Sequence, residues 1–132
     1  MGAWGVRSFE NDDALDWVVR LNKAPDTSVL HEAFASILHA NGHLEAPRCY
    51  YALAAAEVVA VLRGRPLPKL PHEVPTFVAR VAASPSPELL EMAAKAVERV
   101  KTKSELRDLW DESVDAKHWL AEIGDLQKRL AH

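Results

Sequence analysis

Residues 49–62 read Cys49-Tyr50-Tyr51-Ala52-Leu53-Ala54-Ala55-Ala56-Glu57-Val58-Val59-Ala60-Val61-Leu62. On a helix this run is apolar on nearly every side, and Glu57 is its only charged residue. A helix that is hydrophobic all round lies buried among other elements, and its alanines allow neighbouring helices to approach closely. We therefore predict that residues 46–63 form the central helix of a helical bundle.

The segments on either side of this central helix are amphipathic. Their apolar residues recur at helical spacing, and no stretch shows the sustained alternation of a strand. Capping residues, glycines and prolines predict where these helices begin. The predicted starts are Asn11, one of residues 26–28, Pro71 or Pro75, Ser86, the capping box 102–105 with Thr102 as its cap, and Ser113 or Asp115.

The expected fold class is therefore all-α. We predict one compact bundle of about six to seven short helices over residues 1–132, which is a suitable length for one hydrophobic core. Residues 1–10 would form an N-terminal clasp, and residues 64–75 a stiff, proline-rich connector.

Composition and charge exclude several classes of function. A content of 48% hydrophobic and 27% charged residues is typical of soluble globular proteins and argues against disorder. The net charge of −3 offers no general attraction to nucleic acid or to an anionic membrane, so neither is expected as a partner. Cys49 is the only cysteine, and no signal segment or long apolar run opens the chain, so we expect a cytoplasmic protein. No cofactor is predicted, and the sequence does not indicate an oligomeric state.

Three short patterns have plain structural explanations. Arg63-Gly64-Arg65-Pro66 matches the core of a minor-groove AT-hook, but a glycine after a helix and arginines at its end are ordinary C-terminal features. The histidines at 31, 39 and 43 lack the spacing of a metal motif, so we expect them at the surface or in caps. Cys49 is expected to pack as a small hydrophobe.

Glu57 is expected to be at least partly buried, and a buried carboxylate requires a partner. We predict that the N-terminal block supplies this partner, from Arg7, Trp4 or backbone amides of the turn. The alternative is that Glu57 lies on the one wetted edge of its helix.

Acidic residues gather at the predicted start of the first helix. Asp12 and Asp16 are four residues apart and share a helical face, so they are weak candidates for binding a divalent cation or for acid and base roles. An acidic first turn also stabilises a helix, and Asp16 could pair with Arg20. The structural interpretation is favoured, and no metal is assigned.

The N-terminal block has a specific sequence motif. It opens with Met1-Gly2-Ala3-Trp4-Gly5 and continues with Phe9-Glu10-Asn11-Asp12 and Ala14-Leu15-Asp16-Trp17. This motif resembles the Gly-x-Trp-Gly turn and the Asn-Asp-x-Ala-x-Asp helix start of a bacterial family, domain of unknown function 4259. The family pattern usually has glycine where this chain has Arg7. The resemblance implies a small bacterial cytosolic helical domain and no substrate. The residues that match the pattern are Trp4, Gly5, Phe9, Asn11, Asp12, Asp16 and Glu57.

Two classes of function follow. The first is a protein-interaction or regulatory module, including an immunity-type protein that neutralises a protein partner through an acidic helical face. The alternative is a metal-binding protein or enzyme that uses the carboxylates of Asp12, Asp16 and Glu57. The alternative requires these three groups to line one accessible cleft. The aromatic residues Trp4, Phe9 and Trp17 are expected to hold the chain start against the bundle.

Overall fold

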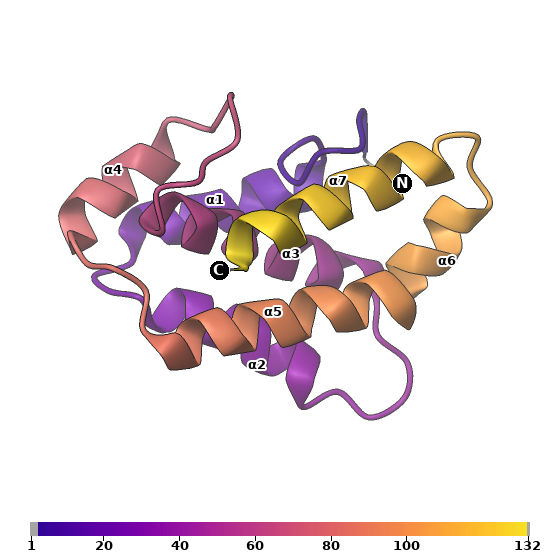
Figure 1. Ribbon diagram of the computed structural model, residues 1–132, viewed down its shortest axis with the longest axis horizontal. Coiled ribbons are helices and arrows are strands. Elements are labelled where there is room, and N and C mark those ends of the chain that lie inside the picture. The colour runs from indigo at the N-terminus through magenta and orange to yellow at the C-terminus, as the bar shows by residue number, and fades with distance from the viewer. Residues whose placement is uncertain (1–2, 132) are drawn as a thin grey trace.

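The computed structural model describes residues 3–131, and within that range the chain is all-α. The helices are α1 (Asp12–Lys23), α2 (Ser28–Leu38), α3 (Ala46–Leu62), α4 (Glu73–Val81), α5 (Pro87–Thr102), α6 (Glu105–Asp111) and α7 (Ala116–Leu130). Figure 1 shows α7 passing in front of α3 and α5 running below it in front of α2, with the N-terminal loop and the α3–α4 connector at the upper edge.

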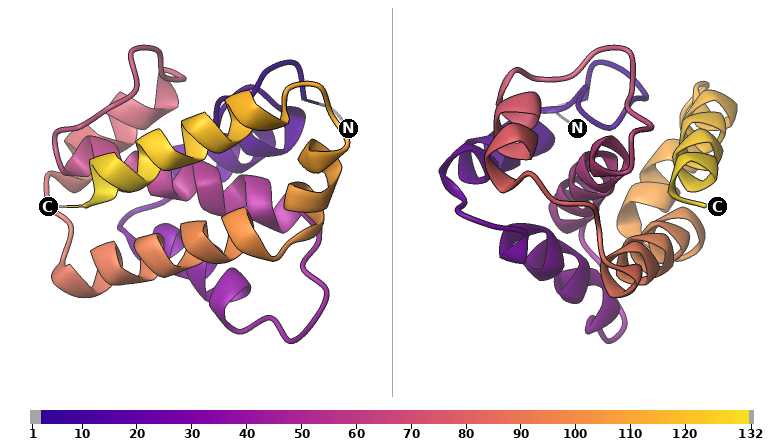
Figure 2. Two further views of the ribbon diagram at one scale, coloured as in Figure 1. Left: turned by 45° about the vertical axis from the view of Figure 1, so that its right-hand side comes forward. Right: turned by 60° about the vertical axis from the view of Figure 1, so that its left-hand side comes forward.

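The helix α3 is the centre of the bundle, as predicted. It packs against all six of the other helices in the described range, and every residue from Ala52 to Ala60 is buried. Figure 2 shows α3 enclosed by the surrounding helices in both views. An all-apolar helix has no face to offer to water, so the other helices wrap it with their apolar sides.

Two predicted helix starts are confirmed by their capping bonds. The Asn11 side chain accepts a hydrogen bond from the Ala14 amide at 2.7 Å and begins α1. The Ser86 hydroxyl accepts from the Leu89 amide at 3.1 Å and begins α5, with Pro87 at the first helical position. Each bond satisfies an amide that the helix itself leaves unpaired.

The predicted cap of α6 was wrong. Thr102 is the last residue of α5, and its hydroxyl donates to the Glu98 carbonyl at 2.8 Å. The cap is Ser104, whose buried hydroxyl accepts from the Arg107 amide at 3.0 Å and donates to the Val100 carbonyl at 2.7 Å. Ser104 therefore hydrogen-bonds a free carbonyl at the end of α5 and a free amide at the start of α6. The helix α6 begins at Glu105, later than the capping box predicted.

Arginine side chains hold the C-terminal ends of several helices. Arg80 of α4 donates to the Ala24 carbonyl at 2.8 Å and the Leu21 carbonyl at 3.1 Å, at the end of α1. Arg65 of the connector donates to the Ala131 carbonyl at 2.7 Å, at the end of α7. The last carbonyls of a helix lack partners within the helix and carry its negative dipole end, so a guanidinium suits both needs.

Among the described residues, no helix combines the length and the apolar character that crossing a membrane requires.

Candidate functional site

The N-terminal clasp is a tight turn that folds back on itself before α1. The Trp4 amide donates to the Glu10 carbonyl, and the Glu10 amide donates to the Arg7 carbonyl, both at 3.0 Å. A Cβ atom at Gly5 would lie 2.5 Å from Glu10 Oε1, so a side chain there would displace the Glu10 carboxylate, which accepts a hydrogen bond from the Arg7 amide at 3.0 Å. Met1 and Gly2, the opening residues of the motif, lie outside the described residues.

The clasp is fastened to the bundle through Ser8, Phe9 and Asn11. Phe9 is buried in the core, and the Asn11 side chain donates to the Ser8 carbonyl at 3.1 Å while it caps α1. Asn11 therefore fixes the end of the turn and the start of the helix at the same time. This arrangement directs the Ser8 hydroxyl toward α3.

Glu57 is buried, as predicted, and it has two partners. Its carboxylate accepts a hydrogen bond from the Ser8 hydroxyl at 2.8 Å. It also receives both terminal nitrogens of Arg129, Nη1 at 2.6 Å and Nη2 at 3.1 Å, in a two-pronged ion pair. Burial by itself lowers the pKa of Arg129, but hydrogen bonds and charge from Glu57 and Asp125 outweigh it, and the pKa is raised overall.

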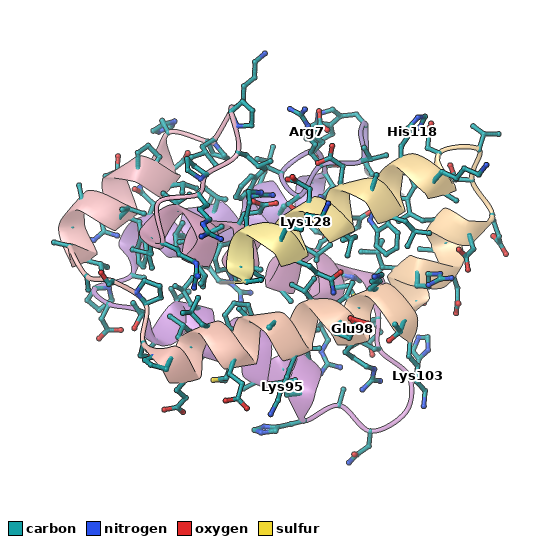
Figure 3. The ribbon with its side chains drawn as sticks, in the orientation of Figure 1. Arg7, Lys95, Glu98, Lys103, His118 and Lys128 are labelled. Carbon is teal, nitrogen blue, oxygen red and sulfur yellow. The ribbon has the colours of Figure 1, made fainter. Side chains whose placement is uncertain are left out.

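The predicted pairing of Glu57 with Arg7 was wrong. Arg7 is exposed, and its Nε lies 3.6 Å from the Glu122 carboxylate of α7. Figure 3 shows Arg7 at the outer edge of the clasp, on the side of α7. The N-terminal block does supply a donor to Glu57, but it is the small Ser8 hydroxyl, which fits the enclosed space. The cation comes from α7, 72 residues further along the chain.

The three carboxylates of the alternative prediction do not converge. Glu57 is 2% exposed and held by Ser8 and Arg129, whereas Asp12 and Asp16 lie on the exposed side of α1. In the described part of the chain, no group of three or more His, Cys, Asp or Glu side chains is placed to hold a metal ion.

Asp12 and Asp16 form no ion pair with another described residue. The expected Asp16–Arg20 ion pair does not form between these two described residues, because Arg20 lies instead over the ring of Tyr51, 5.6 Å from its centre. Burial, followed by the charges of Asp16 and Asp12, raises the pKa of the neighbouring Asp13. The negative charge of α1 is therefore concentrated at its N-terminal end, whereas Arg20 and Lys23 place positive charge in its last turn.

The exposed side of α1 is also apolar. Leu15 and Val19 lie one turn apart and are 38% and 53% exposed. Leu15 contributes to a groove of about 250 Å³ between the clasp and the connector. The groove is lined by Arg7, Phe9, Glu10, Leu15, Leu67, Lys69, Leu70 and Pro71.

Trp4 is a further exposed apolar residue, and it belongs to the clasp that forms one wall of the groove. Its side chain is 60% exposed, so the expectation that it holds the chain start onto the bundle was wrong, whereas Phe9 and Trp17 are buried as expected. We call the groove together with Trp4, Val19, Asp12 and Asp16 the N-terminal surface.

A family model described as a domain of unknown function (DUF4259) matches residues 2–122. The chain belongs to this family. Comparisons with curated proteins and with solved structures found no match. The part that matches DUF4259 contains the clasp, the N-terminal surface and Glu57, and it ends before Arg129. The resemblance predicted from the N-terminal motif is therefore confirmed, and it carries no assigned activity.

The three short patterns of the sequence, namely the AT-hook match, Cys49 and the histidines, do not form a functional site in this DUF4259 chain. Gly64 ends α3 with φ +83°, and Arg65 is engaged with the end of α7, so the AT-hook pattern is part of the fold. Cys49 is fully buried, and burial raises the pKa of its thiol to about 11. His39 and His43 are exposed, and His43 lies 3.3 Å from the Glu105 carboxylate.

Proposed function

We propose that this chain is a protein-interaction module of the regulatory or immunity type, acting in the bacterial cytoplasm, with the N-terminal surface as its docking site. The observation that carries the proposal is the apolar groove with Leu15 in its lining, together with two further exposed apolar residues near the start of the chain. Of the five large hydrophobic residues exposed in the described range, Trp4, Leu15 and Val19 lie within the first nineteen residues. Exposed apolar residues that gather around a groove mark contact surfaces more often than scattered ones do.

The two aspartates favour a partner with positive charge beside α1, while Arg7 and Lys69 line the groove itself. Asp12 and Asp16 flank the exposed Leu15 on α1, and neither carboxylate has a cationic partner among the described residues. A partner segment with a large apolar side chain would fill the groove, and adjacent lysine or arginine residues would meet the two aspartates. Complementary charge of this kind increases the association rate and selects the partner.

The test is site-specific photo-crosslinking followed by binding measurements. A photoreactive residue at Val19 in the full chain should capture a partner from the native host. The same residue at Val114 is the matched control, since Val114 is 99% exposed in the loop between α6 and α7. The partner should carry a basic and apolar segment at the crosslink.

Binding of the purified partner then decides the role of charge. The double variant Asp12→Asn/Asp16→Asn should weaken binding roughly tenfold at low salt, and the difference should shrink as salt rises. Asp108→Asn, an exposed aspartate on α6, should leave binding unchanged. A partner that crosslinks from Val114 and not from Val19, or that binds the double variant equally well, would contradict the proposal.

A further inference from the structure

A second cavity lies on the other side of α1, where α1, α2 and α3 meet. Its volume is about 200 Å³, smaller than the space a drug-sized ligand requires. It is lined by Trp17 and Arg20 of α1, Val29, Glu32, Ala33 and Ser36 of α2, and Arg48 and Tyr51 of α3. None of these residues belongs to the N-terminal surface.

Two guanidinium groups face this cavity without an acidic partner. Arg48 is fixed by the Ser36 side chain, whose hydroxyl accepts from Arg48 Nε at 2.8 Å, and by the Ser36 carbonyl. Arg20 lies over the Tyr51 ring and keeps its donors available. Neither arginine forms an ion pair with a carboxylate anywhere in residues 3–131. The planar guanidinium of arginine matches the geometry of a carboxylate or phosphate and can bind either with two hydrogen bonds.

The other residues that line the cavity indicate which kind of anion would bind there. Glu32 at the rim reduces the net charge of the cavity to that of a single cation, which favours a monoanion over a doubly charged phosphate. Trp17, Val29 and Tyr51 offer apolar and aromatic surface for the body of the ligand. We infer that this cavity binds a small carboxylate that carries an apolar or aromatic group, with Arg20 and Arg48 holding its carboxylate.

The experiment is an NMR titration of the ¹⁵N-labelled full chain with sodium benzoate at constant ionic strength. Saturable shifts are expected at the amides of Ser36 and Tyr51 and at the Arg48 Nε signal. Benzamide has the same ring without the charge and should bind much more weakly. Inorganic phosphate should also bind more weakly than benzoate.

Two variants test the electrostatic assignment in opposite directions. Arg20→Gln removes an exposed cation that donates no hydrogen bond to the backbone of the described residues. The fold should therefore persist, while benzoate binds roughly tenfold more weakly. Glu32→Gln removes a like charge from the rim and should tighten benzoate binding, an effect that loss of folding cannot imitate. Arg7→Gln, which changes an arginine of the N-terminal surface, should bind benzoate like the original chain.

Several outcomes would overturn the inference. These are shifts that never saturate, benzamide binding as tightly as benzoate, tighter binding of phosphate, or unchanged affinity in Arg20→Gln. Because the cavity and the N-terminal surface share no residue, each proposal can fail without the other.

Discussion

At the scale of single residues, the ion pair of Glu57 and Arg129 has the largest energetic consequence. Both side chains are mostly removed from water, being 2% and 14% exposed, so removing one leaves an uncompensated buried charge. We expect Glu57→Gln to lower the free energy of unfolding by about 3–5 kcal/mol, as measured by urea denaturation.

The control for this variant is Glu122→Gln. It removes the half-buried partner of the exposed Arg7, at a long contact of 3.6 Å, and should cost less than about 1 kcal/mol. The double variant Glu57→Leu/Arg129→Met replaces the pair by apolar side chains of similar size and should recover most of the loss. Equal losses from Glu57→Gln and Glu122→Gln would show that the buried pair has no special role.

The two exposed aspartates of α1 allow a second prediction at this scale. Asp12 and Asp16 offer only two carboxylates, and no third ligating side chain completes a cluster in the described residues. We expect millimolar magnesium, calcium or manganese to produce no saturable change in tryptophan fluorescence. A saturable change that Asp12→Asn abolishes would restore the metal-binding alternative.

At the scale of helices, the bundle depends on arginines that end a neighbouring helix. Arg80 of α4 holds the last carbonyls of α1, at Leu21 and Ala24. We expect Arg80→Ala to cost about 1 kcal/mol and to speed hydrogen exchange of amides in the last turn of α1. Lys23→Ala, which removes an exposed cation from the same turn, should change neither measurement. Faster exchange spread over the whole chain would argue against a local capping role.

At the scale of the whole molecule, burial of two weak acids limits stability at alkaline pH. Burial raises the pKa of Cys49 from 9.0 to about 11 and the pKa of Tyr50 from 10.0 to about 12. Above pH 9 the unfolded chain therefore binds fewer protons than the folded chain, so stability falls as pH rises. We expect a loss of roughly 3–4 kcal/mol by pH 11 from the two groups together, measured by urea denaturation.

The variant Cys49→Ala/Tyr50→Phe separates these two groups from the other titrating residues. It should flatten the decline above pH 9, because its two positions no longer release protons. A decline of the same slope in this variant would assign the alkaline transition to other groups.

The sequence by itself determined the helical class, the central position of α3, the caps at Asn11 and Ser86, and the membership of the family. These features rest on residues within one or two turns of one another, so periodicity and capping chemistry are sufficient to predict them. Burial of Glu57 was also predictable, because its neighbours along α3 are all apolar.

Only the tertiary structure decided which groups meet across the bundle. Arg129 reaches Glu57 because α7 packs on α3. The sequence around the chain's other arginines does not distinguish them from Arg129 as partners of that carboxylate. The exposure of Trp4 depends likewise on how the clasp packs on the bundle, since the backbone hydrogen bonds of the turn form without its side chain. Each of the two cavities is lined by residues from separate helices or loops. Local sequence patterns do not predict which of these elements pack together.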